Sequence, residues 1–535
     1  MRTAAKNLNH FDFIDILRGV AIVLVLLCHT LGTVYGYGLI PWDGWLLDLS
    51  GFSLASYLLL PLSFGNAGVA IFFVISGFCI HLSFHQQGKN WGEFFIRRFF
   101  RIYPAYLAAL VFFTVFIYAR FLPWAVLSRE FWIQFLSHAF LVHNFHPSTI
   151  SGLNGAFWSL ALEAQLYACY PALLWLVAKA GWQRSMAVLG LCQIAIQGSD
   201  SAFQMANATQ TLGGQVSWFL CNSVLGYWFS WALGAWLAEA FLGKRTLPQF
   251  GSSWVWWLGM TIASHFIKPL LNFQFLFASL FAAAIIGKHF SSDRRRPLNN
   301  PAARAFKNIG LWSYSLYLLH LPLLSCYHNT LDSLLPSGWH LTPPLEFCLT
   351  LLTWLAILPF SFAWYRTFEL PAIGWGKRLG AKLEKPAAAN AKNNQGSITP
   401  ATGRPWPLIV TVGVWAVISI ALNARFEPLN YVENNDLAWS FATNPDASRR
   451  NASLAVKHAE IAVVQTGTNV TVTVGTLAAA YAEAGMFDKA IEFGQRACDL
   501  ASRHGETNLL EINQKLLLYY QNHQPFHMGE ELIRK

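Results

Sequence analysis

Residues 11–31 read FDFIDILRGVAIVLVLLCHTL, a long apolar run with Arg18 near its start and His29 deep inside it. On a helix that rises about 1.5 Å per residue these two groups lie about 16 Å apart, roughly half the thickness of a hydrocarbon core. The run therefore predicts a membrane-spanning helix with a cation near one face and an imidazole near the middle. Ionisable groups inside a bilayer are costly, so His29 is a candidate functional residue. The alternative is a packing histidine, hydrogen-bonded to a neighbouring helix.

The composition is that of a polytopic membrane protein. Apolar residues make up 54% of the 535 residues and charged residues only 12%, against about 25% in soluble proteins. The net charge of +10 does not indicate nucleic-acid binding, because the Lys and Arg fall mainly in short segments between apolar runs, where they set membrane orientation. The eight cysteines show no CxxC or metal-like spacing, so neither a disulfide framework nor a zinc site is expected.

The order of apolar and basic segments predicts an all-α fold of about ten core transmembrane helices plus an eleventh. The core spans after the first are expected at about 66–84, 103–122, 154–176, 185–197, 217–240, 252–267, 270–289, 309–328 and 344–364. Residues 35–65, rich in Gly, Pro and aromatics, suit a re-entrant or interfacial segment. A cytoplasmic N-terminus then places most of the basic connections inside.

The chain divides into four segments by composition. They are a membrane domain over 1–375, a cytoplasmic linker over 376–404, an extra transmembrane helix over 405–424 and an extracytoplasmic helical domain over 425–535. Within the last, residues 476–501 match a tetratricopeptide repeat at its small and aromatic positions, namely Leu477, Ala478, Tyr481, Ala490 and Ala497. The alternative for this region is a plain helical hairpin.

Two further sets of intramembrane residues suggest chemistry. Glu163 lies about one turn inside a predicted span, and a carboxylate beside a neutral imidazole is the usual arrangement of a general base, which makes His29 and Glu163 a candidate pair. Arg98 and Arg101 are three residues apart and share a helix face. Such a pair suits a phosphorylated ligand, because guanidinium groups bind phosphate through two hydrogen bonds. The alternative is that both arginines are ordinary anchors at the inner membrane face.

Six motifs in a fixed order identify a resemblance. Together they are similar to the membrane acyltransferase-3 family, the bacterial O-acetyltransferases that modify cell-surface glycans, across residues 10 to about 375. An Arg followed after ten residues by a His matches Arg18 and His29, and an RxxR motif matches Arg98 and Arg101. The motifs are LRGVAIVLVLLCH, FFVISGF, RRFFRIYPAY, FWSLALEAQLY, SYSLYLLHLP and FELP.

This resemblance implies transfer of an acyl group, usually acetyl, from cytoplasmic acyl-CoA to a sugar hydroxyl across the membrane. His29 would act as the base or as a transient acyl carrier, supported by Glu163. Arg18, Arg98 and Arg101 would hold the phosphates of coenzyme A, and no metal is expected. Supporting residues would be Trp158, Ser159, Tyr314, His320 and Glu369.

The resemblance also implies a place in the cell and a set of partners. The chain would be a multi-pass protein of a bacterial inner membrane, with an acyl-CoA donor, a glycan or glycolipid acceptor and the lipid bilayer as its partners. The helical tail is a candidate scaffold for another protein. A different class of function stays open from the residues alone, since the buried Arg, His and Glu also suit a non-enzymatic transporter or flippase.

Overall fold

The computed structural model describes most of the chain as helices joined by turns. It covers residues 2–35, 60–86, 90–114, 129–206, 208–209, 211–245, 254–291, 300–334, 343–391, 431–466 and 470–528, and no strand forms within these ranges. The all-α prediction is confirmed. Most of the segment 35–65, the second part of the span expected at 103–122 and the extra helix expected at 405–424 lie outside the described residues.

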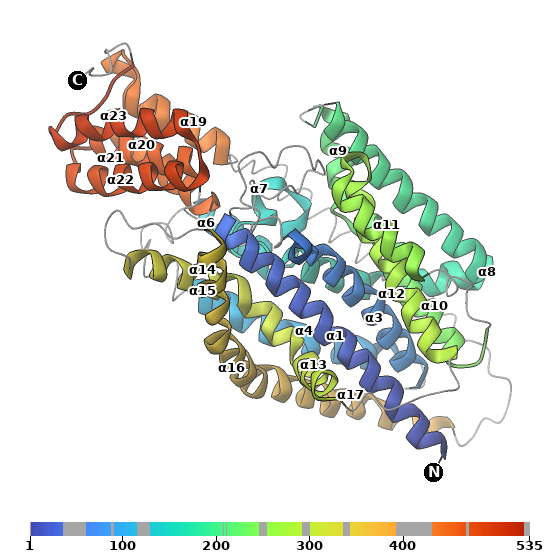
Figure 1. The fold of residues 1–535 in the computed structure, drawn as a ribbon. Helices are drawn as coiled ribbons and strands as arrows, with labels where there is room; N and C mark the ends of the chain where they lie inside the picture. The colour runs from blue at the N-terminus through green and yellow to red at the C-terminus, as the bar shows by residue number, and fades with distance from the viewer. Residues whose placement is uncertain are drawn as a thin grey trace.

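The membrane part is a bundle of helices of very different lengths (Figure 1). Its α-helices are α1 (Arg2–Tyr35), α3 (Gly65–Gln86), α4 (Trp91–Phe113), α6 (Arg129–Ala139), α7 (Pro147–Ile150), α8 (Trp158–Met205), α9 (Leu212–Cys221), α10 (Trp228–Phe241), α11 (Trp254–Phe266), α12 (Gln274–Ser291), α13 (Pro301–Leu311), α14 (Ser313–Leu334), α15 (Pro343–Leu352), α16 (Trp354–Trp364) and α17 (Leu370–Ala391). Short 3-10 turns are η2 (Leu60–Ser63), η5 (His143–Phe145), η6 (Val224–Gly226) and η8 (Lys268–Phe273), and a π turn, η9, covers Tyr365–Glu369.

Length and hydropathy single out the helical stretches that are able to cross a membrane. Within the described residues there are five, and the pair α13 and α14, bent by 81°, makes a sixth if it counts as one span. The five stretches are Asp12–Val34, Pro61–Gln86, Trp158–Met205, Pro269–Ser291 and Pro344–Lys382. The chain is therefore a multi-pass membrane protein.

Several expected spans have different boundaries in the structure. The two spans expected at 154–176 and 185–197 both lie within α8, as two helical segments that meet at a kink at Gly181, where φ is +77° and ψ is 162°. Only glycine adopts this backbone conformation readily, so the chain changes direction there without a loop. The single span expected at 217–240 is instead interrupted between α9 and α10. Ser223 accepts a hydrogen bond from the backbone N–H of Leu225, and such side-chain bonds compete with the helical ladder.

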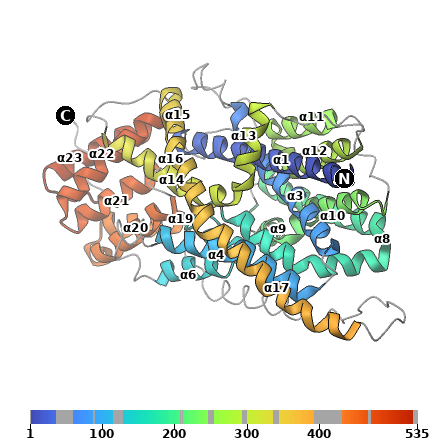
Figure 2. The same ribbon diagram turned by 90° about the horizontal axis from the view of Figure 1, so that it is seen from below.

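The helices that follow the bent pair form a nearly continuous rod. Thr353 separates α15 from α16, and the π turn η9 joins α16 directly to α17. Helix α17 extends to Ala391, into the residues for which the sequence predicts a linker. It packs along α4, as Figure 2 shows from below.

Close contact between α3 and α10 organises the centre of the bundle. A Cβ atom on Gly77 would lie 2.0 Å from the backbone oxygen of Trp231, and one on Gly234 would lie 1.9 Å from that of Val74. Small residues at such crossings allow two backbones to approach, which is a common basis of helix association in membranes. Helix α1 packs on α3 and α13 at the same centre.

The tail forms a separate helical core. Its helices are α19 (Tyr431–Thr443), α20 (Ala452–Thr466), α21 (Thr471–Glu483), α22 (Phe487–His504) and α23 (Thr507–Gln521), with a 3-10 turn, η10, at Ala447–Arg449. Each helix packs on the next one along the chain, and α21 also packs on α19 and α23. The five residues predicted for the repeat register are all buried. Sequential packing of this kind is shared by helical repeats in general, so the tetratricopeptide assignment stays a prediction.

Candidate active site

Residues from five helices surround one cavity inside the membrane bundle. The cavity has a volume of about 120 Å³ and is lined by α1, α3, α4, α8 and α14. Six of the residues singled out from the sequence line it, namely Arg18, Arg98, Arg101, Ser159, Glu163 and Tyr314. Segments almost 300 residues apart along the chain therefore contribute to a single site, as the resemblance implies.

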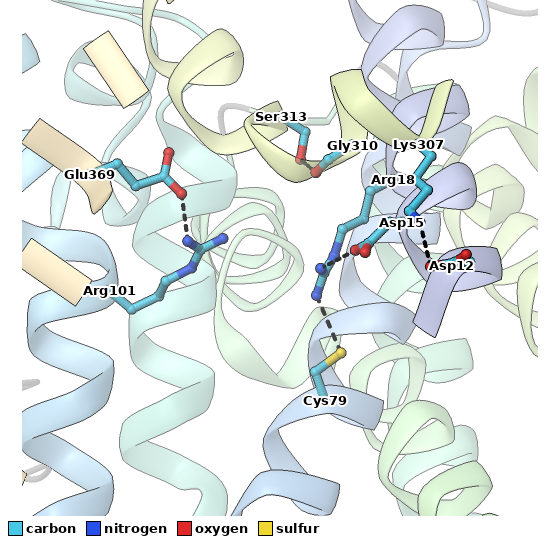
Figure 3. Close-up of polar contacts among 9 residues, drawn as sticks. All are labelled: Asp12, Asp15, Arg18, Cys79, Arg101, Lys307, Gly310, Ser313 and Glu369. Atoms are coloured by element: carbon cyan, nitrogen blue, oxygen red, sulfur yellow. Dashed lines mark hydrogen bonds and ion pairs between the residues drawn. The ribbon is translucent and has the colours of Figure 1, made fainter. Parts of the chain in front are cut away.

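Arg18, on α1, is held at the cavity by one contact within its own helix and one with a neighbouring helix. Its guanidinium forms an ion pair with Asp15 one turn earlier, at 2.9 Å, and donates a hydrogen bond of 3.2 Å to the sulfur of Cys79 on α3. Nearby, Lys307 of α13 pairs with Asp12 at 2.7 Å. These contacts, drawn in Figure 3, fix the N-terminal half of α1 against its neighbours.

Arg101 faces the same space from α4 (Figure 3). Its guanidinium contacts the carboxylate of Glu369 at 2.5 Å, and Ser315 donates a 2.6 Å hydrogen bond to the other oxygen of that carboxylate. Glu369 ends the π turn η9 and is fully buried. Since a buried charge requires a partner, Glu369 fixes the guanidinium of Arg101 beside the ring of Tyr314, 5.7 Å away.

Arg98 differs from the other two arginines of the cavity. It donates one hydrogen bond of 3.2 Å to the hydroxyl of Ser83, and its buried Nε has no hydrogen-bond partner. Within the described part of the chain no carboxylate lies within 4.0 Å of it. Among the three arginines of the cavity, Arg98 is therefore the one without a carboxylate partner in the described residues, which suits it to an anionic ligand.

Glu163 lies in the cavity. Its carboxylate accepts a 2.8 Å hydrogen bond from Ser76 and a short one from Tyr167, one turn further along α8. The indole of Trp231 donates in turn to Ser76 at 3.2 Å. The described partners of Glu163 are therefore Ser76 and Tyr167, and the support of His29 by Glu163 stays a prediction.

His29 lies in a second polar cluster, further along α1. Its ring centroid is 5.0 Å from that of His320 on α14. The Nδ1 of His320 donates to the backbone oxygen of Tyr317 at 2.8 Å, which leaves its buried Nε2 as an acceptor. The Tyr317 hydroxyl lines the cavity and lies 2.7 Å from that of Ser159. One turn of α14 therefore connects the cavity to the histidine pair.

Five polar residues of the cavity were not singled out from the sequence: Ser76, Cys79, Tyr167, Ser313 and Tyr317. For two of them a helical spacing was available as a signal. Tyr167 is four residues after Glu163, and Tyr317 is three residues after Tyr314, so each pair shares a helix face. Of the remaining expected site residues, Trp158 packs its ring against Tyr227, with centroids 5.6 Å apart.

The cavity with its arginines and the nearby histidine pair form a polar site inside a polytopic helical bundle. Such a site in a membrane protein serves either a reaction or transport. Comparison with known proteins decides between a reaction site and a transport site. The acyltransferase-3 family model, described as an acyltransferase domain, matches residues 11–364. The chain belongs to this family and is an O-acyltransferase, so the non-enzymatic transporter that the residues alone left open is not supported.

Three curated relatives agree with this assignment. Acyltransferase MdmB of Streptomyces mycarofaciens is 25% identical over 284 residues, which cover 50% of this chain and 70% of the relative. Nodulation protein 10 of Rhizobium leguminosarum bv. viciae is 26% identical over 303 residues, covering 48% and 73%. Peptidoglycan O-acetyltransferase OatA of Listeria monocytogenes is 32% identical over 143 residues, covering 23% and 22%. No solved structure matches the chain.

Proposed function

We propose that this membrane acyltransferase moves an acyl group, acetyl in the first instance, from cytoplasmic acyl-CoA to a hydroxyl of a cell-surface glycan or glycolipid. The observation that carries the proposal is the guanidinium of Arg98, which lines the cavity and has no carboxylate partner within the described residues. Phosphate groups are the ligands that such a guanidinium binds best. Arg18 and Arg101, already oriented by Asp15 and Glu369, add positive charge to the same cavity.

The cavity would hold only the phosphate end of acyl-CoA and not the whole molecule. Its volume of about 120 Å³ is below the roughly 300–1,000 Å³ of pockets that enclose a whole small molecule. In acyl-CoA a long flexible arm separates the phosphates from the thioester. With phosphate near Arg98, that arm would carry the acyl group along α1 toward His29.

His29 is the proposed base for the transfer. It would take the proton of the acceptor hydroxyl as the oxygen attacks the thioester carbonyl, and the carbon–sulfur bond would then break. The departing thiolate would receive that proton, which returns His29 to its neutral form. A stepwise route, in which His29 itself carries the acyl group before the hydroxyl attacks, satisfies the same balance of atoms.

The acceptor and the orientation are proposed on separate grounds. A relative that matches over 143 residues is a peptidoglycan O-acetyltransferase, which supports a surface glycan as the acceptor. We propose a bacterial inner membrane, with the N-terminus inside and the tail outside, because the basic connections then lie on the cytoplasmic face. The tail, proposed to be tetratricopeptide-like, would bind a protein partner of the glycan machinery.

Fractionation of transferred label tests the function. Membranes that contain the wild type or His29→Ala are given acetyl-CoA labelled in the acetyl group, and glycan, glycolipid and protein fractions are counted. The proposal expects label in a glycan or glycolipid fraction only with the wild type. Label that reaches these fractions equally with both chains would contradict it, and so would the absence of transfer in membranes where both chain and acceptors are present.

A further inference from the structure

A third polar cluster, distinct from the cavity and from the pair of His29 and His320, lies at the end of α3 and α10. It consists of His81 and His85 on α3 and Glu239 on α10, hereafter the HHE cluster. One ligand atom from each of the three side chains lies within 4.8 Å of the others. His81 and Glu239 are almost completely buried, with 1% and 8% of their surface exposed. The family's motifs quoted above include none of these residues.

The spacing within α3 has a chemical meaning. Residues four apart lie on one face of a helix, and two histidines at this spacing are a common zinc-binding pair. The third side chain comes from the helix that packs most closely on α3. Two imidazoles and one carboxylate form a ligand set found in zinc sites that keep a fourth position open.

Hydrogen bonds orient both rings toward the carboxylate. The Nδ1 of His85 lies 3.1 Å from the backbone oxygen of His81, and a carbonyl only accepts, so this nitrogen carries the proton. The Nε2 of His85 then carries a lone pair and faces Oε1 of Glu239 at a distance of 3.5 Å. Two acceptors that face each other repel unless a proton or a metal ion lies between them.

His81 has the supporting contact that metal ligands require. Its Nε2 is 2.8 Å from Oε1 of Glu239, and its Nδ1 is 3.1 Å from the hydroxyl of Tyr170. With a metal on Nε2, Nδ1 would donate to the Tyr170 oxygen, which is how outer hydrogen bonds hold metal-binding histidines in place. Zinc bonds of about 2.0–2.1 Å place tetrahedral ligands about 3.3 Å apart, and the two measured distances to Glu239, 2.8 and 3.5 Å, lie on either side of that value.

We propose that the HHE cluster binds a divalent transition metal, with zinc as the preferred ion, through His81, His85 and Glu239. The ammonium of Lys244 contacts Oε1 of Glu239 at 3.1 Å, and its side chain is 44% exposed. Lys244 therefore forms an ion pair with the carboxylate when no metal is bound, and its side chain is able to move into solvent when a metal is bound. An imidazole and carboxylate site prefers zinc or a similar ion to magnesium or calcium, which favour oxygen ligands.

Such an ion would stabilise α3, which forms one side of the cavity. It would join the ends of α3 and α10, and α3 also supplies Ser76 and Cys79 to the cavity lining. Ser83, which lies between the two histidines, accepts the hydrogen bond from Arg98. Because it lies outside the cavity, the metal would hold the ends of the two helices together and would take no part in the acyl transfer proposed at His29.

Zinc binding to the whole chain tests the proposal. The protein is purified in detergent without a polyhistidine tag, treated with a chelator and titrated with zinc in the absence of acyl donor. We expect one zinc per chain, and an affinity at least tenfold lower in both His85→Ala and Glu239→Gln, since even the loss of a supporting contact weakens metal sites by about 10–100-fold. Because no substrate is present, the result does not depend on the proposed function.

Two variants serve as matched controls. Lys244→Met removes only the competing cation, so it should bind zinc as tightly as the wild type or more tightly. His289→Ala removes a histidine near the end of α12 that stacks on Phe13, and should change nothing. Failure of the wild type to bind about one zinc, or equal binding by wild type and His85→Ala, would overturn the proposal.

A measurement on the wild type alone covers the case in which ligand variants do not fold. X-ray absorption at the zinc edge should show nitrogen and oxygen neighbours at about 2.0–2.2 Å. A shell of sulfur at about 2.3 Å would instead show that cysteines bind the ion, and this would contradict the HHE cluster as the site.

Discussion

The membrane bundle and the tail bury different kinds of side chain. Around the cavity, the bundle places the partly buried Arg18, Arg98 and Arg101, and it fully buries the carboxylate of Glu369. The tail core is mainly alanine, leucine and tyrosine, with Tyr481 and Glu460 as a buried hydrogen-bonded pair. Buried charge is costly and persists where it has a use, whereas small residues serve helix packing. The contrast supports the proposal that the reaction takes place in the bundle and that the tail has a packing or binding role, and the following variants test it.

The largest effect is expected at His29. His29→Ala removes the proposed base and should lower the rate of acyl transfer by about 10²–10⁴-fold, the usual contribution of general base catalysis. The measurement is the initial rate with labelled acetyl-CoA in membranes, corrected for the amount of chain. His458→Ala in the tail, where the ring contacts Asn434 at 2.8 Å, is the matched control and should keep the wild-type rate. A His29→Ala rate within twofold of wild type would exclude this histidine as the base.

The ion pair of Arg101 with the buried carboxylate of Glu369 comes next, and its effect is on stability. Arg101→Ala leaves the carboxylate of Glu369 buried with Ser315 as its remaining partner. Loss of one member of a buried pair costs about 3–5 kcal/mol, so the variant should unfold at a markedly lower temperature in detergent. The exposed pair Lys515 and Glu511 of the tail offers a contrast, because Lys515→Ala should leave the unfolding temperature almost unchanged. Equal shifts in the two variants would contradict the assigned role of Glu369.

Arg98 should affect donor binding more than turnover. Arg98→Ala removes a charge-assisted contact to phosphate worth about 1.5–3 kcal/mol, which corresponds to a KM for acetyl-CoA raised by roughly 10–100-fold. Arg98→Lys should recover part of the loss, since it restores charge but not the planar fork. Arg97→Ala is the control, because the neighbouring arginine pairs with Glu93 instead of lining the cavity. If both alanine variants changed KM equally, general surface charge would explain the effect.

The smallest effect on activity is expected in the tail. Ala497 is fully buried, and Ala497→Leu should overpack this core at a cost of about 1–3 kcal/mol. The tail should then be cleaved faster in limited proteolysis, while the rate of acyl transfer stays within twofold of wild type. A large loss of transfer with an intact membrane bundle would show that the tail takes part in the reaction.

Sequence patterns predicted the local features of the site well. A span carrying Arg18 and His29 is found, and so is the shared face of Arg98 and Arg101, because both follow from helical spacing and hydropathy. The segment breaks were harder to predict. Gly181 joins two helical segments through a single non-helical residue, and Ser223 interrupts an apolar run through one side-chain bond. Neither feature changes the hydropathy of the sequence, and hydropathy is the property from which membrane spans are predicted.

Contacts between distant segments were not predictable from one sequence. The pairing of Glu369 with Arg101 joins residues 268 positions apart, and the HHE cluster brings Glu239 to a helix that ends at Gln86. Hydropathy shows which face of a helix is apolar, but it does not show how that helix is rotated against its neighbours. For the same reason the contacts of Glu163 with Ser76 and Tyr167 were not predicted.

The central claim is that donor binding in the arginine cavity and chemistry at His29 are separate steps on one helix. Binding of labelled coenzyme A and transfer of the acyl group are measured side by side on the purified full chain of wild type, His29→Ala and Arg98→Ala. The account predicts that His29→Ala binds coenzyme A like the wild type and transfers nothing, whereas Arg98→Ala binds it roughly 10–100-fold more weakly. Unchanged binding by Arg98→Ala, together with wild-type transfer by His29→Ala, would contradict it.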